Sequence, residues 1–201
     1  MENADFTLQK EHSIKVPEIT ALDLPYCVKQ ESNDFYMKVF EKRRRGKNRK
    51  MTIVFTIYQT YLNRGEYFDI VHLGKMLKLN ESDSNASISV CLKTSSLYDL
   101  PDIHIGQVDP VAMIDYYCGD RVLNIDEEEK QQIIEIYNSI VGESCISQEG
   151  KKSTVAACVY YWIRLNSLAI NETVYRNAFP GVTMNKIEDL SFKISCLLQE
   201  H

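Results

Sequence analysis

The chain has 201 residues, of which 44% are hydrophobic and 25% are charged, and its formal net charge at pH 7 is −5. This composition is typical of a folded globular protein, and the length allows one domain or two lobes of about 100 residues each. No apolar run approaches the roughly 18 residues that a membrane helix needs, and the N-terminus lacks the features of a signal peptide, so we expect a soluble intracellular protein.

The first half is predicted to be helical. Its expected elements are an N-terminal segment over 1–20 and helices over about 26–42, 51–65, 70–77 and 82–97. The helix that starts at Met51 has the strongest apolar stripe, with spacings of three and four residues, and Gly65 is placed to end it. Asp69 has the residue type and position of an N-cap for the short helix that follows.

A dense basic run precedes this strong helix. Seven of the nine residues 42–50 are Lys or Arg, whereas residues 101–201 hold 8 Lys/Arg against 15 Asp/Glu. Arg dominates the start of the run, and Gly46 with Asn48 is typical of a turn. A solvated face is one interpretation of such a run. Because Arg suits phosphate contact, a loop that binds nucleic acid or an acidic protein surface is the other.

The second half begins after a predicted linker over 101–110, which carries two prolines and a glycine. The helices expected in this half lie over about 111–118, 127–141, 155–163, 172–178 and 184–197, with a loop over 142–150. Asn124 or Asp126 is predicted to cap the acidic first turn, and Asn171 and Thr183 are predicted to cap the last two helices. Pro180-Gly181 predicts the turn between them. Sparse Gly and Pro, and no sustained strand alternation, predict an all-α fold.

The two halves repeat one another. Lys50 to Tyr58 (KMTIVFTIY) aligns with Lys152 to Tyr160 (KSTVAACVY), with Lys, Thr and Tyr in the same places. In each half basic residues precede this helix, and a short capped helix and a final helix follow it. We therefore predict a duplicated domain, with a first repeat over 21–100 and a second over 111–201.

This arrangement resembles the cyclin-box fold, two tandem five-helix cyclin-like repeats, and more specifically the core domain of transcription factor IIB. The resemblance spans about residues 19–198. It is carried by the run from Leu24-Pro25 to Tyr58, by the basic turn Arg45-Gly46-Lys47, by Phe68-Asp-Ile, by Val155 to Tyr160, and by Asn171 to Ile194.

The resemblance implies a general transcription initiation factor of the nucleus. Members of that family bind the TATA-binding protein on promoter DNA and hold RNA polymerase II, with the basic turn of the first lobe in a minor groove. It implies a monomer that binds DNA weakly by itself, without catalysis, cofactor or metal. The DNA-contacting residues expected on this basis are Arg43, Arg44, Arg45, Gly46, Lys47, Arg49, Lys50, Lys151, Lys152, Asn185 and Lys186.

The sequence also departs from that family. Glu188 and Asp189 stand on the helix that would read the major groove, where a carboxylate repels phosphate, and there is no CxxC pair for the N-terminal zinc ribbon. Two alternatives stay open, a cyclin-type regulatory subunit of a protein kinase and a IIB-related factor of RNA polymerase III. An enzyme is disfavoured because the acidic run 127–129 is typical of a helix first turn and the four histidines lack ligand spacing.

Overall fold

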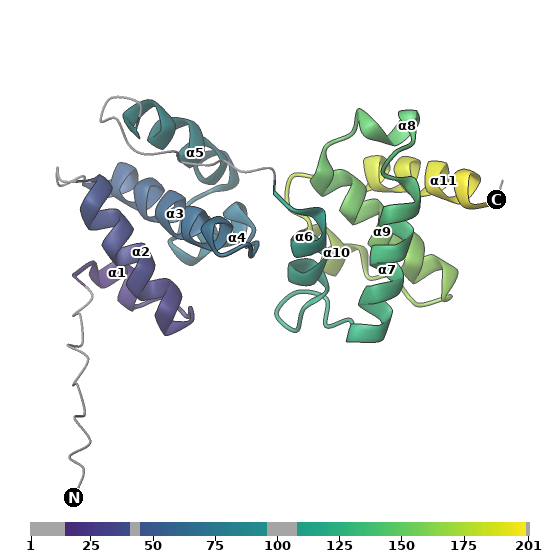
Figure 1. Ribbon diagram of the computed structural model, residues 1–201, viewed down its shortest axis with the longest axis horizontal. Helices are drawn as coiled ribbons and strands as arrows, with labels where there is room; N and C mark the ends of the chain where they lie inside the picture. Colours follow the sequence, from purple (N-terminus) through teal and green to yellow (C-terminus); the bar gives the residue numbers. More distant parts are fainter. Residues whose placement is uncertain (1–14, 41–44, 96–107, 200–201) are drawn as a thin grey trace, which may run out of the picture.

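The computed structural model describes residues 15–40, 45–95 and 108–199, which contain eleven α-helices and no strand. The predicted all-α fold class is therefore confirmed. Figure 1 shows the helices as two groups arranged side by side, with α1 to α5 in the first lobe and α6 to α11 in the second. None of the helices in these ranges is long and apolar enough to cross a membrane.

Each lobe is built around one long central helix. The first lobe contains α1 (Pro17–Thr20), α2 (Tyr26–Val39), α3 (Gly46–Asn63), α4 (Ile70–Met76) and α5 (Glu81–Ser95). The second lobe contains α6 (Pro110–Cys118), α7 (Glu127–Ile140), α8 (Ser144–Ser147), α9 (Lys151–Leu165), α10 (Glu172–Ala178) and α11 (Met184–Gln199).

The central helices are buried on nearly every side. In α3 all residues from Met51 to Tyr61 are buried, and α2, α4 and α5 pack around them. In α9 the buried run is Thr154 to Tyr160, covered by α6, α7 and α11. Each half thus places a long helix, a central helix, a seven-residue helix and a final long helix in the same order. The tandem five-helix repeat and its boundaries stay predictions, which a superposition of the two halves would test.

Several element boundaries differ from those expected. Helix α2 ends at Val39, three residues early, and α9 begins at Lys151, four residues early. Two four-residue helices were not predicted, because α1 lies in the expected N-terminal segment and α8 occupies part of the loop predicted over 142–150. The largest difference is at α3, which begins at Gly46 and not at Met51. The predicted turn over Arg45 to Lys47 is therefore wrong in extent, because only Arg45 lies outside the helix and Gly46, with φ of +55°, starts it.

The predicted caps are confirmed where their hydrogen bonds can be read. Asp126 forms a capping box with Glu129 at the start of α7, and Asn171 accepts two backbone N–H groups at the start of α10. Thr183 accepts the N–H of Lys186 at 3.4 Å, and the Pro180-Gly181 turn separates α10 from α11. These signals act within four residues, which explains why the sequence was sufficient to find them.

Helix α4 approaches α5 unusually closely. A Cβ placed on Gly74 would lie 1.8 Å from Ser84 Oγ and 2.7 Å from Ser84 Cβ. Ser84, at this contact, and Ser87, one turn further along α5, are both fully buried, and their hydroxyls donate to the backbone carbonyls of Asn80 and Ser84. The Ser-rich sequence of α5, which predicts only a weak helix, therefore reflects small side chains at a tight helix–helix contact.

Candidate nucleic-acid interface and the junction between the lobes

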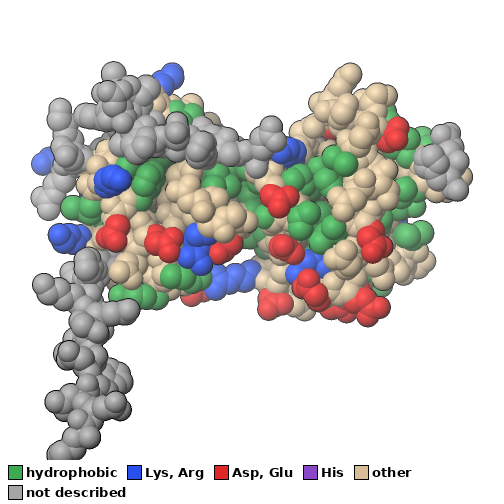
Figure 2. All heavy atoms as spheres, viewed as in Figure 1, with side chains coloured by type: hydrophobic (Ala, Val, Ile, Leu, Met, Phe, Trp, Pro, Cys, Tyr) green, Lys and Arg blue, Asp and Glu red, His purple; other side chains and the backbone are tan. Residues whose placement is uncertain are grey.

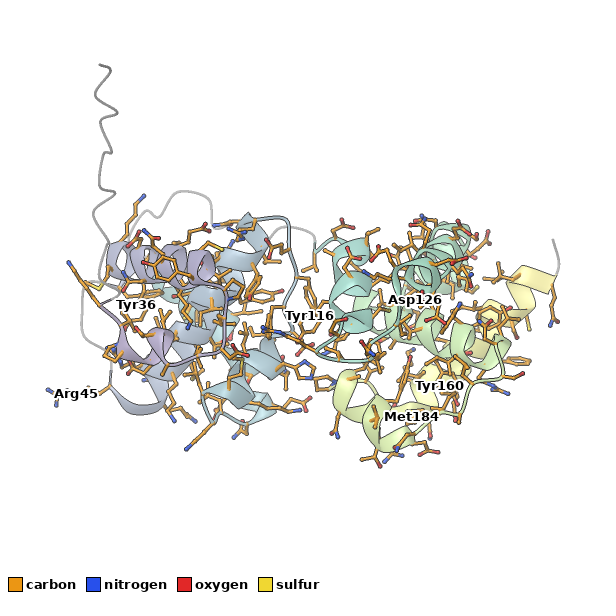
Figure 3. All side chains as sticks on the ribbon, turned by 90° about the horizontal axis from the view of Figure 1, so that it is seen from below. Tyr36, Arg45, Tyr116, Asp126, Tyr160 and Met184 are labelled. Atoms are coloured by element: carbon orange, nitrogen blue, oxygen red, sulfur yellow. The ribbon has the colours of Figure 1, made fainter. Side chains whose placement is uncertain are left out.

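The basic run predicted to contact DNA lies at the outer end of the first lobe. Arg45 is the N-cap residue of α3 and has extended backbone, while Lys47 and Arg49 belong to its first turn and Lys50 follows them. Arg43 and Arg44 lie outside the described residues. Figure 3 shows Arg45 at one extremity of the molecule, with Tyr116 between the two lobes.

Two of these basic residues are already paired with acids. Arg49 makes a bidentate ion pair with Glu18, through Nε at 2.6 Å and a terminal nitrogen at 2.8 Å, and its guanidinium lies 5.7 Å from the ring centroid of Tyr36. The hydrogen bonds between them raise the pKa of Arg49 and lower the pKa of Glu18. Lys47 Nζ lies 2.9 Å from Asp83 of α5 but its side chain remains 62% exposed. Arg49 therefore holds α1 against α3, whereas Lys47 stays accessible.

Arg45 and Lys50 form no ion pair with any residue in the described ranges. Both belong to the end of α3 where the first backbone N–H groups point outward, and the helix dipole adds positive potential there. Basic residues are unfavourable in this position unless an anion neutralises them, and Glu18 and Asp83 do so only in part. The outer end of α3 is therefore electropositive, a property that suits phosphate oxygens.

The candidates in the second lobe have different surroundings. Lys151 donates to the Val108 carbonyl at 3.0 Å, and Lys186 forms an ion pair with Glu149 at 2.6 Å. Lys152 points into the junction between the lobes. Only Asn185, which is exposed at the start of α11, has no such partner in the part of the chain that the structure describes.

The structure does not bring the two sets of basic residues together. Helix α3 has 18 residues, so its two ends lie about 27 Å apart. The basic residues near Arg45 lie at the beginning of α3. Lys152 instead contacts Asp69, which follows the end of α3 in the chain. A continuous basic surface across both lobes therefore does not form through Lys152.

A buried polar cluster surrounds Asp69, whose side chain is 1% exposed. Its Oδ1 accepts the backbone N–H groups of Val71 at 2.8 Å and of His72 at 3.2 Å, which caps α4. Its Oδ2 accepts from Lys152 Nζ at 2.6 Å and from the Tyr117 hydroxyl at 2.5 Å. One carboxylate therefore joins α4 of the first lobe to α6 and α9 of the second.

The electrostatics of this cluster favour an ionised aspartate. Burial alone would raise the pKa of Asp69, but the charge and hydrogen bond of Lys152, with the Tyr117 hydroxyl, hold that pKa below its ordinary value. Burial raises the pKa of Tyr117 and of Tyr67, whose hydroxyls lie 3.2 Å apart, so both phenols stay protonated. The cluster is a satisfied structural centre, since each of these polar groups has a partner.

His72 makes further polar contacts between the two lobes. His72 Nε2 lies 2.9 Å from the Asn177 carbonyl and so donates to it, while Nδ1 lies 2.7 Å from the Tyr116 hydroxyl. Tyr116 also packs against Tyr67 and Phe68, with ring centroids 5.5 and 4.9 Å away. Helix α4 thus contacts α6 and α10, and in Figure 1 it lies at the edge of the first lobe that faces the second.

Sequence reasoning missed this junction. It treated Asp69 only as a cap and Lys152 as a candidate phosphate contact. A usable signal was present, because Asp69 occupies the position of Asn171 in the repeat, and a carboxylate that replaces an amide at a buried cap needs a cation.

No protein-family model matches the chain, and the search of curated proteins found no match. Among the described residues no group of three or more His, Cys, Asp or Glu side chains could hold a metal ion.

Proposed function

We propose that this protein is a general transcription initiation factor of the transcription factor IIB type, which joins a TATA-binding protein on promoter DNA to RNA polymerase II in the nucleus. The observation that carries the proposal is the outer end of α3, where Arg45, Lys47 and Lys50 surround the exposed start of a long buried helix. A rigid helix that presents cations at its N-terminus suits a narrow, negative groove.

The net negative charge of the chain as a whole supports a bridging role. With a net charge of −5, the chain is expected to bind DNA weakly by itself, so a partner already on the promoter supplies most of the affinity. The cluster at Asp69 supports the same role, because it fixes the two lobes relative to each other and so preserves the spacing of two binding surfaces.

The test is a gel-shift assay of the full chain on TATA-containing DNA, with and without TATA-binding protein. The variant Arg45→Ala/Lys50→Ala removes two cations that hold no ion pair in the described structure, so folding is spared. We expect a partner-dependent complex that this variant weakens, with a salt slope smaller by about two. The control, Lys75→Ala/Arg164→Ala, makes the same charge change at exposed positions on α4 and α9 and should leave the complex intact.

One observation favours a second function. Three of the candidate DNA contacts form ion pairs with acidic residues of the same chain, namely Arg49, Lys152 and Lys186. Few of the candidate cations are therefore left to bind DNA phosphates. A cyclin-type subunit of a protein kinase has the same expected fold and no need of those cations. Absence of a partner-dependent complex at low salt, together with activation of a kinase by the purified chain, would replace the first proposal by this one. A IIB-related factor of RNA polymerase III would instead give the complex on a polymerase III promoter.

A further inference from the structure

The second lobe has an apolar groove that none of the preceding contacts uses. It has a volume of about 290 Å³ and lies where α7 begins, α9 ends and α10 begins. Its lining includes Leu123, Ile125, Trp162, Leu168, Val174 and Glu129. Leu168 and Val174 are 49% and 48% exposed, although apolar side chains of this size are usually buried. The volume is at the low end for a small-molecule site and suits one or two apolar side chains of a partner.

One edge of the groove is strongly acidic. Glu129 lines it, and Glu128 lies beside Glu129 and four residues before Gln132, whose side chain accepts from Trp162 Nε1 at 2.9 Å. Residues four apart share a helix face, so Glu128 lies on the face of α7 from which Gln132 contacts Trp162. Neither glutamate has an ion pair with a residue in the described ranges. Figure 2 shows acidic side chains gathered along the lower edge of the second lobe, where α7 begins in Figure 1.

We propose that this groove docks a basic amphipathic helix of a partner protein, with apolar side chains of that helix against Leu168 and Val174 and its Lys or Arg beside Glu128 and Glu129. Apolar anchors supply the affinity, and the carboxylates, which form no ion pair within the described residues, select a cationic partner. A helix-in-groove contact needs only a short apolar strip, which this groove provides. The docking is distinct from DNA binding, because none of the candidate DNA contacts lines this groove.

Trp162 makes this proposal directly measurable. It is the only tryptophan in the chain and forms part of the groove wall, so its fluorescence reports on docking. The probe is a synthetic peptide of about five helical turns with leucine at spacings of three and four and lysine elsewhere. One comparison peptide carries glutamate in place of lysine. A second has the leucine and lysine residues shuffled, so that it keeps the charge but has no apolar face.

We expect the leucine–lysine peptide to change Trp162 emission saturably, and both comparison peptides to leave it unchanged. Leu168→Ser/Val174→Ser should weaken binding about tenfold or more, because both substitutions remove the apolar contact. Glu128→Gln should weaken it about two- to fivefold at low salt. Glu143→Gln makes the same charge change beyond the far end of α7, at an exposed residue without an ion pair in the described structure, and should have no effect.

Three results would overturn the proposal. The first is no saturable signal from the leucine–lysine peptide up to about 1 mM, which is the range of the weakest specific complexes. The second is equal binding of the shuffled peptide, which would indicate non-specific attraction to an acidic surface. The third is a dimer of the full chain, seen by sedimentation velocity, that Leu168→Ser/Val174→Ser converts to a monomer, since a second copy would then be the occupant. Each result leaves the gel-shift test of DNA binding unaffected.

Discussion

The central helices α3 and α9 contain matched sequences, but the lysine that starts the matched stretch has a different role in each. Lys50 lies at the outer end of the first lobe and forms no ion pair within the described residues, whereas Lys152, at the matching position, reaches the buried carboxylate of Asp69. The helix caps that follow differ in the same way, because Asp69 is buried while Asn171 is exposed. A repeat in sequence therefore conserves local structure, but contact between the lobes gives one copy of each residue a new role.

The largest expected effect is the loss of Lys152. Lys152→Ala leaves the Asp69 carboxylate buried without its cation and should lower the free energy of unfolding by about 3–5 kcal/mol. Lys50→Ala, at the matching position, should change it by less than about 0.5 kcal/mol. Urea unfolding followed by circular dichroism measures both. An equal decrease in the free energy of unfolding for both variants would contradict the different roles inferred for Lys50 and Lys152.

The two caps provide the second comparison. Asp69→Ala removes a cap and also leaves the hydroxyl of Tyr117 without its acceptor, so we expect a loss of about 2–4 kcal/mol. Asn171→Ala removes only an exposed cap and should cost about 1 kcal/mol. The same unfolding assay applies. If Asn171→Ala proves the more costly of the two, the Asp69 cluster does not hold the lobes together.

The third comparison concerns the short helices α4 and α10. Gly74→Ala places a methyl group against Ser84 and should cost about 1–3 kcal/mol, because α4 must move away from α5. Arg176 is at the matching position in α10, and its side chain is 62% exposed in a surface pair with Glu172. Arg176→Ala should therefore change stability by less than about 0.5 kcal/mol. Thermal unfolding midpoints distinguish the two variants. An unchanged midpoint for Gly74→Ala would indicate that α5 moves away from α4 at little cost in stability.

The smallest expected effect is a dependence of protein stability on pH. It is small because burial raises the pKa of Asp69 while Lys152 lowers it, so the two influences partly cancel. The pKa of Asp69 is lower in the folded protein than in the unfolded chain. Its contribution to stability is therefore present above the unfolded value of about 3.9 and is lost as the pH falls toward the folded value. Unfolding measured from neutral to acidic pH should show this loss, and Asp69→Asn should reduce it. An unchanged pH profile in Asp69→Asn would assign the acid sensitivity to other carboxylates.

Much of the candidate DNA site followed from the sequence, but its details did not. The basic run was found from composition, and its place before a buried helix from periodicity. The start of α3 at Gly46 was not predicted, because no acid or cap marks it and a run of cations opposes the helix dipole. The positive charge at the start of α3 is partly neutralised by Glu18, 31 residues before Arg49, and by Asp83, 36 residues after Lys47.

The sequence by itself determined the all-α class, the order of the longer helices and the cap at Asn171, because apolar periodicity and capping act over a few residues. It narrowed the cap of α7 to Asn124 or Asp126, and the structure decided for Asp126. Only the tertiary structure decided which cations are free and which are paired, since Lys152 and Asp69 lie 83 residues apart. It also decided that Trp162, Leu168 and Val174 line one groove beside an acidic edge. These properties arise from packing between elements distant in the chain, and local signals do not encode such packing.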